Sequence, residues 1–409
     1  MRVEVLAIGD ELLDGRVADT NTLRLAEALS GVGVKITQRT TITDDKEVIV
    51  REARAIAARG AALCVVSGGL GPTTDDVTSE AFADLLGVEL IRDESQASAI
   101  QARLERLGRE MTANQLKQAD RPAGAAVISN QHGTAPGFEL TFEGCRFISV
   151  PGVPREFDPM VAEAVIKPLL EDHAPTPRVI LRSFGLVEAQ VGQRLAPLSE
   201  RWPGVRLGYR AHFPEIQISL KVSPGEEDAL QAAAAFVREA LGEHLFSERS
   251  GPFAQELVEA LQERGLTLAL AESCTGGLMG DLVTDVPGSS RVLVQGVVAY
   301  SNECKERRLA VPAAVLAEHG AVSEETVVAM ARGICRVSGA DIGVAVSGIA
   351  GPEGGSAEKP VGTVWLAVEA GGETTTRLLT LPFDRRRNKM VSAYSGLDMV
   401  RRYLLGKKT

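Results

Sequence analysis

The sequence predicts an α/β protein of several domains, with an α/β domain at each end and a small α+β module between them. The chain of 409 residues exceeds what a single hydrophobic core usually supports, so two or three domains are expected. Strand-like and helix-like segments alternate near both ends, which is typical of mostly parallel sheets covered by helices. In the middle the pattern changes to longer strands with clean apolar–polar alternation.

The first predicted domain covers residues 1–172. Three apolar runs predict buried strands, at residues 3–8, 34–38 and 62–66. Helices are expected at residues 20–29, after the acidic pair Asp44-Asp45, and from about Val77. In sheets of this kind ligands bind at the carboxyl ends of the strands.

The middle module is predicted at residues 173–246, followed by a linker at residues 247–251. Its expected strands are residues 178–184 and 215–222, and its expected helices are residues 188–195 and 226–241. The linker is polar and ends in Gly-Pro, which favours a break between domains. The module has the size of a spacer or a dimerisation element, so we expect a homodimer. A second α/β domain is predicted at residues 252–409.

The composition of the chain narrows the classes of partner that we expect it to bind. The net charge of −10 and the absence of a basic stripe argue against direct binding of nucleic acid. Five cysteines without C-x-x-C spacing fit reduced thiols and a cytoplasmic protein. No apolar stretch approaches the ~20 residues of a membrane span, so we expect no membrane partner.

The motif Ala-Glu-Ser-Cys-Thr-Gly-Gly follows the apolar run at residues 266–270 and precedes an expected helix. A serine in a strand–turn–helix segment can be a nucleophile, with free N–H groups of the helix N-terminus holding an oxyanion. Ser273 is also a common type of helix cap, and by itself the motif favours the cap. Cys274 is a rival nucleophile, although a small cysteine also packs well in a core.

A second strand, at residues 294–299, delivers Tyr300 and Lys305 to the same sheet edge. The only histidine after the linker is His319, in an ordinary loop, so a Ser-His-Asp triad is not expected. A desolvated lysine, or a tyrosine polarised by it, can activate a serine instead. Tyr300 and Lys305 therefore favour Ser273 as a nucleophile.

A third motif, Val-Ser-Gly-Ile-Ala-Gly-Pro-Glu-Gly-Gly, connects the predicted strand at residues 342–346 to a strand that begins at Thr363. Backbone amides of such a loop can surround a phosphate. Arg385, at the start of the last helix, is equally suited to a phosphate contact and to a salt bridge at the helix start.

The N-terminal domain carries Ser-Gly-Gly-Leu-Gly-Pro-Thr-Thr-Asp-Asp after its third strand. The amides of Gly68, Gly69 and Gly71 suit a pyrophosphate, and we expect Asp45 and Asp76 to hold a divalent metal ion that bridges phosphate oxygens. Helix capping by Asp75 is the alternative to a phosphate site.

These motifs, in this order and over the whole chain, resemble the competence/damage-inducible protein CinA family. The resemblance implies that the C-terminal domain is a nicotinamide mononucleotide deamidase without a metal or other cofactor, in which Tyr300 and Lys305 activate Ser273. The products would be ammonia and nicotinate mononucleotide. The resemblance also implies that the substrate site is lined by Thr275, Gly276, Gly277, Gly348, Ala350, Gly351, Gly355, Thr363 and Arg385.

The N-terminal half resembles the molybdopterin-binding fold, which in this family is associated with ADP-ribose pyrophosphatase activity dependent on a divalent metal, Mg²⁺ or Co²⁺. Thr134 lies in a turn that fits the family pattern and is expected to contact phosphate together with Gly68, Gly69 and Gly71. Both activities handle pyridine nucleotides, so the resemblance implies a bifunctional salvage enzyme. Two alternatives stay open, a molybdopterin-handling transferase and a non-enzymatic partner protein in competence or DNA recombination.

Overall fold

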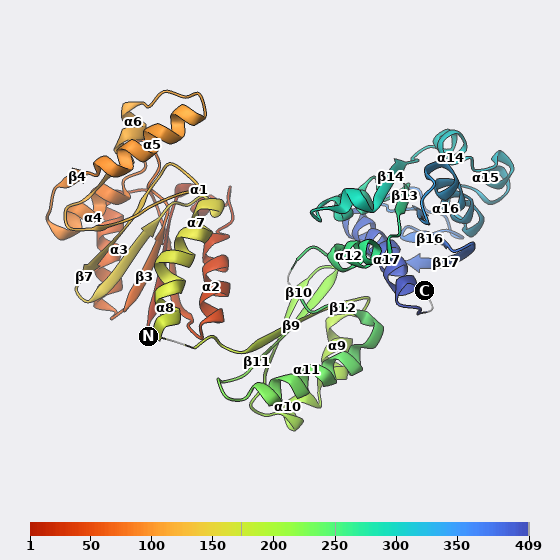
Figure 1. Ribbon diagram of the computed structural model, residues 1–409, viewed down its shortest axis with the longest axis horizontal. Helices are drawn as coiled ribbons and strands as arrows, with labels where there is room; N and C mark the ends of the chain where they lie inside the picture. The colour runs from red at the N-terminus through yellow and green to blue at the C-terminus, as the bar shows by residue number, and fades with distance from the viewer. Residues whose placement is uncertain (173, 250, 408–409) are drawn as a thin grey trace. The chain divides into compact units, whose positions relative to one another are not determined.

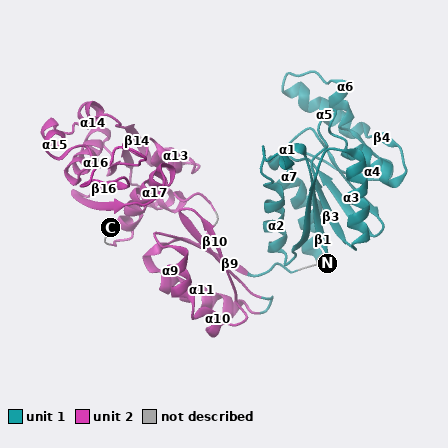
Figure 2. Ribbon diagram, turned by 180° about the vertical axis from the view of Figure 1, so that it is seen from behind, with its two compact units in different colours: residues 1–177, 223–225 teal, residues 178–222, 226–409 magenta. Residues whose placement is uncertain are grey.

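The computed structural model describes residues 1–172, 174–249 and 251–407, which form two compact units (Figure 2). One unit comprises residues 1–177 and 223–225, and the other comprises residues 178–222 and 226–409. The second unit therefore contains the last α/β domain and the predicted middle module except residues 174–177 and 223–225. Residues 173, 250 and 408–409, which fall in the predicted middle module, linker and last domain, lie outside the described residues. The predicted α/β multidomain class is confirmed.

The first unit is built on a six-stranded sheet of order β2-β1-β3-β8-β7-β6. Its strands are β1 (Val3–Ile8), β2 (Ile36–Ile42), β3 (Leu63–Ser67), β6 (Ala126–Ile128), β7 (Gly137–Phe142) and β8 (Cys145–Val150). Strands β2, β1, β3 and β8 are parallel, while β7 runs antiparallel to both of its neighbours. The carboxyl ends of β1 and β3 therefore meet at one edge, as the sequence predicts.

Helices cover both faces of this sheet (Figure 1). On β1, Val5 packs with α2 (Asn21–Gly31) and α7 (Pro154–Val161), and Leu6 packs with α3 (Lys46–Ala58) and α4 (Thr78–Leu86). Because both faces are covered, β1 is apolar on both faces except at Glu4, whose buried carboxylate pairs with Arg2 and Arg59. The remaining elements of the unit are α1 (Asp10–Leu13), β4 (Leu90–Arg92), α5 (Glu94–Arg106), α6 (Ala113–Lys117), β5 (Asp120–Pro122), a π-helix (Ala162–Ile166) and α8 (Lys167–Asp172).

The middle module is an antiparallel sheet of order β10-β11-β9-β12 with helices packed against one face. Its elements are β9 (Arg178–Phe184), α9 (Glu188–Leu195), α10 (Leu198–Arg201), β10 (Arg206–His212), β11 (Glu215–Lys221), α11 (Glu227–Leu241) and β12 (Leu245–Ser247). Strands β10 and β12 were not predicted. They are the two edge strands, and β10 is mostly exposed and polar, so it lacks the apolar alternation that reveals β11.

The last domain is a five-stranded sheet of order β14-β13-β15-β16-β17, in which β14, β13 and β15 are parallel. The strands are β13 (Leu268–Glu272), β14 (Leu293–Val298), β15 (Ile342–Gly348), β16 (Thr363–Ala370) and β17 (Glu373–Thr380). One face packs against α12 (Gln255–Arg264), α13 (Leu278–Thr284) and α17 (Arg385–Leu404). The other packs against α14 (Asn302–Leu309), α15 (Ala313–His319) and α16 (Glu324–Ser338).

This topology places the carboxyl ends of β13, β14 and β15 side by side, because neighbouring parallel strands end at the same edge. Each of the three predicted C-terminal motifs follows one of these strands. No helix in the described part of the chain is long and apolar enough to cross a bilayer.

Candidate functional site

Two side chains from different motifs meet at the end of the C-terminal sheet. Ser273 immediately follows β13, and Lys305 lies in the first turn of α14, after β14. The Nζ atom of Lys305 donates to Oγ of Ser273 at 3.2 Å and to the carbonyl oxygen of Ala299 at 3.0 Å. The lysine is 1% exposed. The structure thus brings together Ser273 and Lys305, a hydroxyl and an amine in hydrogen-bond contact.

Burial lowers the pKa of the Lys305 ammonium below its ordinary value. Only the nearby thiols of Cys304 and Cys274 act to raise this pKa. No salt bridge joins Lys305 to a carboxylate among the described residues, so nothing restores the charge that burial disfavours. A larger fraction of this lysine is therefore neutral near pH 7, the form that accepts a proton from a hydroxyl.

Tyr300 is placed differently from Lys305. It is 62% exposed, and its hydroxyl accepts a hydrogen bond from Arg385 at 3.0 Å. Among the described contacts, no hydrogen bond joins Tyr300 to Ser273 or to Lys305. Tyr300 is therefore bonded to Arg385, and no described hydrogen bond joins it to the reacting hydroxyl.

Cys274 is buried in the core of the last domain. Burial raises the pKa of its thiol to about 12, so the thiol stays protonated at neutral pH. A protonated, inaccessible thiol is a poor nucleophile, which favours Ser273 over Cys274.

Glu272, at the end of β13, is a site residue that the sequence did not reveal. Its buried carboxylate accepts the backbone N–H groups of Gly277 at 3.0 Å, Met279 at 3.1 Å and Gly280 at 2.9 Å. The carboxylate, and not Ser273, caps α13. The expectation that these N–H groups hold an oxyanion is wrong, because Glu272 already occupies them.

The turn after Ser273 offers other donors. Among the described backbone hydrogen bonds, the N–H groups of Cys274 and Thr275 donate to no carbonyl, whereas that of Gly276 donates to Ser273. Gly276 and Gly277 have φ values of +65° and +99°, which side chains rarely adopt. These glycines let the chain turn sharply, and the two amides beside the nucleophile stay available for an oxyanion.

The N-terminal turns of α17 connect the predicted motifs. Arg385 donates to the carbonyl of Gly351 at 2.6 Å, and the buried Asn388 donates to the carbonyl of Ala350 at 3.1 Å. The ammonium of Lys389 lies 3.5 Å from the point where a Cβ on Gly276 would stand. Arg385 contacts the third motif and Tyr300 and forms no salt bridge at the helix start among the described residues, while its expected phosphate contact stays a prediction. Asn388 and Lys389 were missed because no motif surrounds them; their spacing from Arg385 was the only signal.

The Gly-rich loop packs mainly against its own chain. A Cβ on Gly348 would come within 2.6 Å of Val364, and one on Gly351 within 2.6 Å of Val361. A Cβ on Gly355 would also approach the backbone of residue 361 at 2.8 Å. Small residues are therefore needed here for the loop to fold back on the start of β16. The other predicted substrate residues in these motifs, Thr275, Ala350 and Thr363, are buried.

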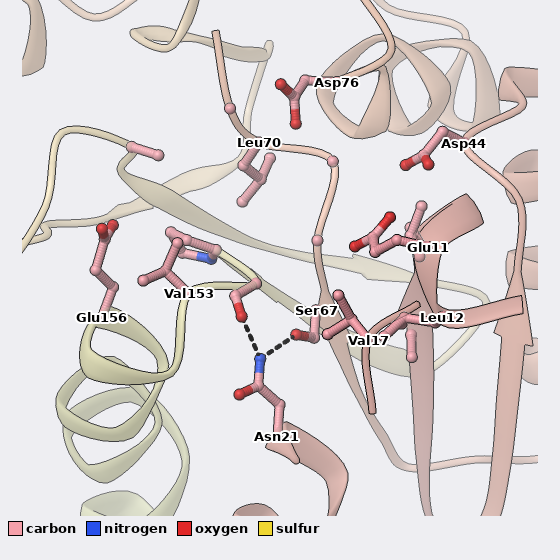
Figure 3. Close-up of a pocket in the computed structure, with 18 of the residues that line it drawn as sticks. Glu11, Leu12, Val17, Asn21, Asp44, Ser67, Leu70, Asp76, Val153 and Glu156 are labelled. Carbon is pink, nitrogen blue, oxygen red and sulfur yellow. Dashed lines mark hydrogen bonds between the residues drawn. The ribbon is translucent and has the colours of Figure 1, made fainter. Parts of the chain in front are cut away.

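The first unit contains a cavity of about 560 Å³ at the carboxyl ends of β1 and β3 (Figure 3). It is lined by all four residues predicted to bind phosphate and by one predicted metal ligand, namely Gly68, Gly69, Gly71, Thr134 and Asp76. Figure 3 shows Asp76, Asp44 and Glu11 near the glycine turn, and Glu156 on the far side of the cavity. The glycine turn is thus a wall of a real cavity.

Asp45, the other predicted metal ligand, does not line this cavity. Its side chain caps α3 by accepting the N–H of Val48, whereas its neighbour Asp44 lines the cavity and accepts the N–H of Asp10 at 2.9 Å. Burial raises the pKa of the Asp44 carboxyl, and the negative charges of Glu11, Asp10 and Asp75 raise it further.

The cavity is strongly acidic. Among the residues that line it there is no lysine, arginine or histidine, while its carboxylates are Glu11, Asp19, Asp44, Asp75, Asp76 and Glu156. Even so, no three His, Cys, Asp or Glu side chains of the described residues are grouped closely enough to hold a metal ion. The protein groups present suit a cation only if a ligand supplies further oxygen atoms.

Comparisons with known proteins cover the whole chain. Residues 251–404 match the family model described as CinA C-terminal domain, and residues 4–172 match the model described as probable molybdopterin binding domain. The chain is 41% identical over 412 residues to a CinA-like protein of Geobacter metallireducens, covering 99% of this chain and 100% of the relative. It is 42% identical over 408 residues to a CinA-like protein of Anaeromyxobacter dehalogenans, covering 98% and 99%.

Among solved structures, the chain resembles the competence/damage inducible protein CihA from Agrobacterium tumefaciens, at 39% identity and a TM-score of 0.36. That match covers 37% of this chain and 93% of the other.

Proposed function

Since this chain belongs to the CinA family, we propose that its last domain is a serine amidohydrolase that converts nicotinamide mononucleotide into nicotinate mononucleotide and ammonia. The observation that carries the proposal is the contact of 3.2 Å between Ser273 and a lysine that is buried without a carboxylate partner. The substrate identity rests on the family resemblance, and the reaction class rests on this pair.

The reaction begins when neutral Lys305 takes the proton of the Ser273 hydroxyl and Oγ attacks the carbon of the carboxamide. The tetrahedral oxyanion is stabilised by the free amides of Cys274 and Thr275. Lys305 then returns the proton to the leaving nitrogen, which departs as ammonia and leaves an ester on Ser273. Water attacks the ester with Lys305 again as the base, releasing the carboxylate and restoring the hydroxyl.

The test is the release of ammonia from nicotinamide mononucleotide by the full chain. Wild type should release one ammonia for each nicotinate mononucleotide formed, and Ser273→Ala should release none. The matched variant Cys274→Ala removes the neighbouring thiol and should keep the activity. If Ser273→Ala were active and Cys274→Ala inactive, the nucleophile would be the thiol of Cys274 and not Ser273.

For the first unit we propose metal-dependent hydrolysis of the ADP-ribose pyrophosphate. The supporting observation is the acidic cavity with a glycine turn in its wall and no cationic side chain in its lining. A pyrophosphate placed there would be repelled unless a cation accompanied it. A divalent ion would supply that charge, with Asp76 and Asp44 as the residues that would hold it.

This second activity is tested with ADP-ribose in the presence of Mg²⁺ or Co²⁺. Hydrolysis should disappear in EDTA and fall strongly in Asp76→Ala, while ammonia release by the last domain stays unchanged. Because the first unit matches a molybdopterin binding domain, molybdopterin is the competing ligand. Binding of molybdopterin without hydrolysis of ADP-ribose would favour the transferase alternative.

A further inference from the structure

Helix α17 carries contacts on two faces, and one of them belongs to the middle module. Arg387, Tyr394 and Arg401 are spaced seven residues apart, so they lie on one side of the helix. Each of the three contacts the middle module. The residues that contact the Gly-rich loop or lie near Gly276, namely Arg385, Asn388 and Lys389, are within the same first turns.

The contact nearest the site is made by the tip of the β10–β11 hairpin. The ring of Phe213 meets the ring of Phe383 edge-on, with centroids 5.3 Å apart. The guanidinium of Arg387 lies over the Phe213 ring at 5.2 Å. Phe383 is the residue whose backbone N–H and carbonyl are both bonded to Asn388. The hairpin tip therefore packs against the segment that begins α17.

Glu215, two residues after Phe213 at the same end of the hairpin, contacts the same helix two turns further on. The hydroxyl of Tyr394 donates to the carboxylate of Glu215 at 2.9 Å, and Arg182 pairs with the same carboxylate at 2.5 Å. Glu215 is buried. The hairpin thus contacts α17 at two points, at Arg387 in the first turn and at Tyr394 in the middle of the helix.

We propose that the β10–β11 hairpin sets the position of the first turn of α17, so that Phe213 is a positioning residue for Arg385 and for substrate binding at the amidase site. The inference rests on the proposed function of that site. Phe213 acts through the start of α17: it packs on Phe383 just before the helix and on Arg387 in its first turn, and Arg385 in that turn bonds Tyr300 and the Gly-rich loop.

The experiment compares full-length wild type, Phe213→Ala and Phe213→Tyr. In Phe213→Ala we expect KM for nicotinamide mononucleotide to rise about fivefold to tenfold, since an aromatic pair and a cation–π contact are lost, with kcat nearly unchanged. Phe213→Tyr keeps the ring and should restore KM. Glu243→Gln is the matched control, because it weakens the ion pair of Glu243 with Arg402 at the far end of α17 and should leave KM unchanged.

Coupling shows whether Phe213 acts through Arg385. If it does, Phe213→Ala should change KM little when Arg385 is already replaced by alanine. Additive effects of the two substitutions, or an unchanged KM in folded Phe213→Ala, would overturn the proposal.

Hydrogen exchange gives a readout that does not depend on activity. The amides of residues 387 and 388 are bonded to Asp384, and their exchange should accelerate in Phe213→Ala but not in Glu243→Gln. If wild type releases no ammonia, the proposed function fails, yet this measurement still decides the role of the hairpin. Unchanged exchange at these amides would refute it.

Discussion

The acidic cavity of the first unit and the Ser–Lys pair of the second handle charge in opposite ways. The cavity gathers carboxylates with no cationic side chain among its lining residues, and the pKa of Asp44 is raised by burial and by its acidic neighbours. The Ser–Lys site instead buries one lysine away from any carboxylate partner in the described structure, and the pKa of Lys305 is lowered. The carboxylates of the cavity favour cations over anions, whereas burial of Lys305 favours its neutral amine over the ammonium.

This difference means that the two sites should respond to different interventions. Chelators should affect only the first, and changes in proton concentration should act most directly on the second.

The largest effect is expected from removing the buried amine. Lys305→Met keeps the volume and the apolar surroundings but has no base, so kcat for ammonia release should fall by about 10²–10⁴-fold. Hydrolysis in the first unit should not change. Comparable ammonia release by Lys305→Met and wild type would show that another group activates Ser273.

The pH dependence should separate a suppressed lysine from an ordinary one. The base is active only when neutral, so kcat/KM should fall about tenfold per pH unit below the pKa of Lys305. Burial lowers that pKa, so the plateau should be reached below 10.5, the ordinary value. The measurement is the pH profile of ammonia release, and a rate that still climbs through pH 10.5 would contradict it.

A smaller effect is expected from Glu272→Gln. The amide keeps the shape but loses the charge that accepts three N–H groups, so the free energy of unfolding should decrease by about 2 kcal/mol. Because α13 and the turn after Ser273 would shift together, kcat should fall about tenfold. Urea denaturation and steady-state kinetics measure the two effects. Unchanged stability would mean that the helix does not depend on this cap.

The smallest effect distinguishes two neighbouring carboxylates. Asp45→Ala removes the cap of α3 and should cost about 1 kcal/mol of stability without altering hydrolysis of ADP-ribose. Asp44→Asn should weaken metal-dependent hydrolysis instead, since Asp44 lines the cavity. If Asp45→Ala lost hydrolysis of ADP-ribose but kept full stability, Asp45 would be a metal ligand after all.

The sequence predicted much of this arrangement because the relevant signals are local. Strand β1 and helix α9 begin and end where the apolar patterns place them. The pairing of Ser273 with Lys305 also follows from local logic, since both residues come after neighbouring parallel strands. By contrast, Asp45 was preferred to Asp44 although a single peptide unit decides which carboxylate turns toward the helix and which toward the cavity.

The other omissions depend on long-range packing. Asn388 reaches the Gly-rich loop from a helix that follows two further strands, and no pattern around it indicates that contact. The role of Glu272 was hidden because its carboxylate folds forward onto the next helix, a direction that residue type does not specify. Tyr300 was grouped with Lys305 on spacing, but the turn that buries the lysine leaves the tyrosine in solvent.

The packing of Tyr394 on α17 against the middle module has a consequence for the production of the last domain as a separate fragment. Cut at residue 252, the fragment would uncover Phe253 and Tyr394, which stack on each other and on Phe184 of the middle module. An exposed aromatic patch of this kind favours self-association of the fragment during expression. Polar substitutions of Phe253 and Tyr394 should therefore make the fragment more soluble. Arg385, Asn388 and Lys389 should be retained, because they lie at the C-terminal motifs.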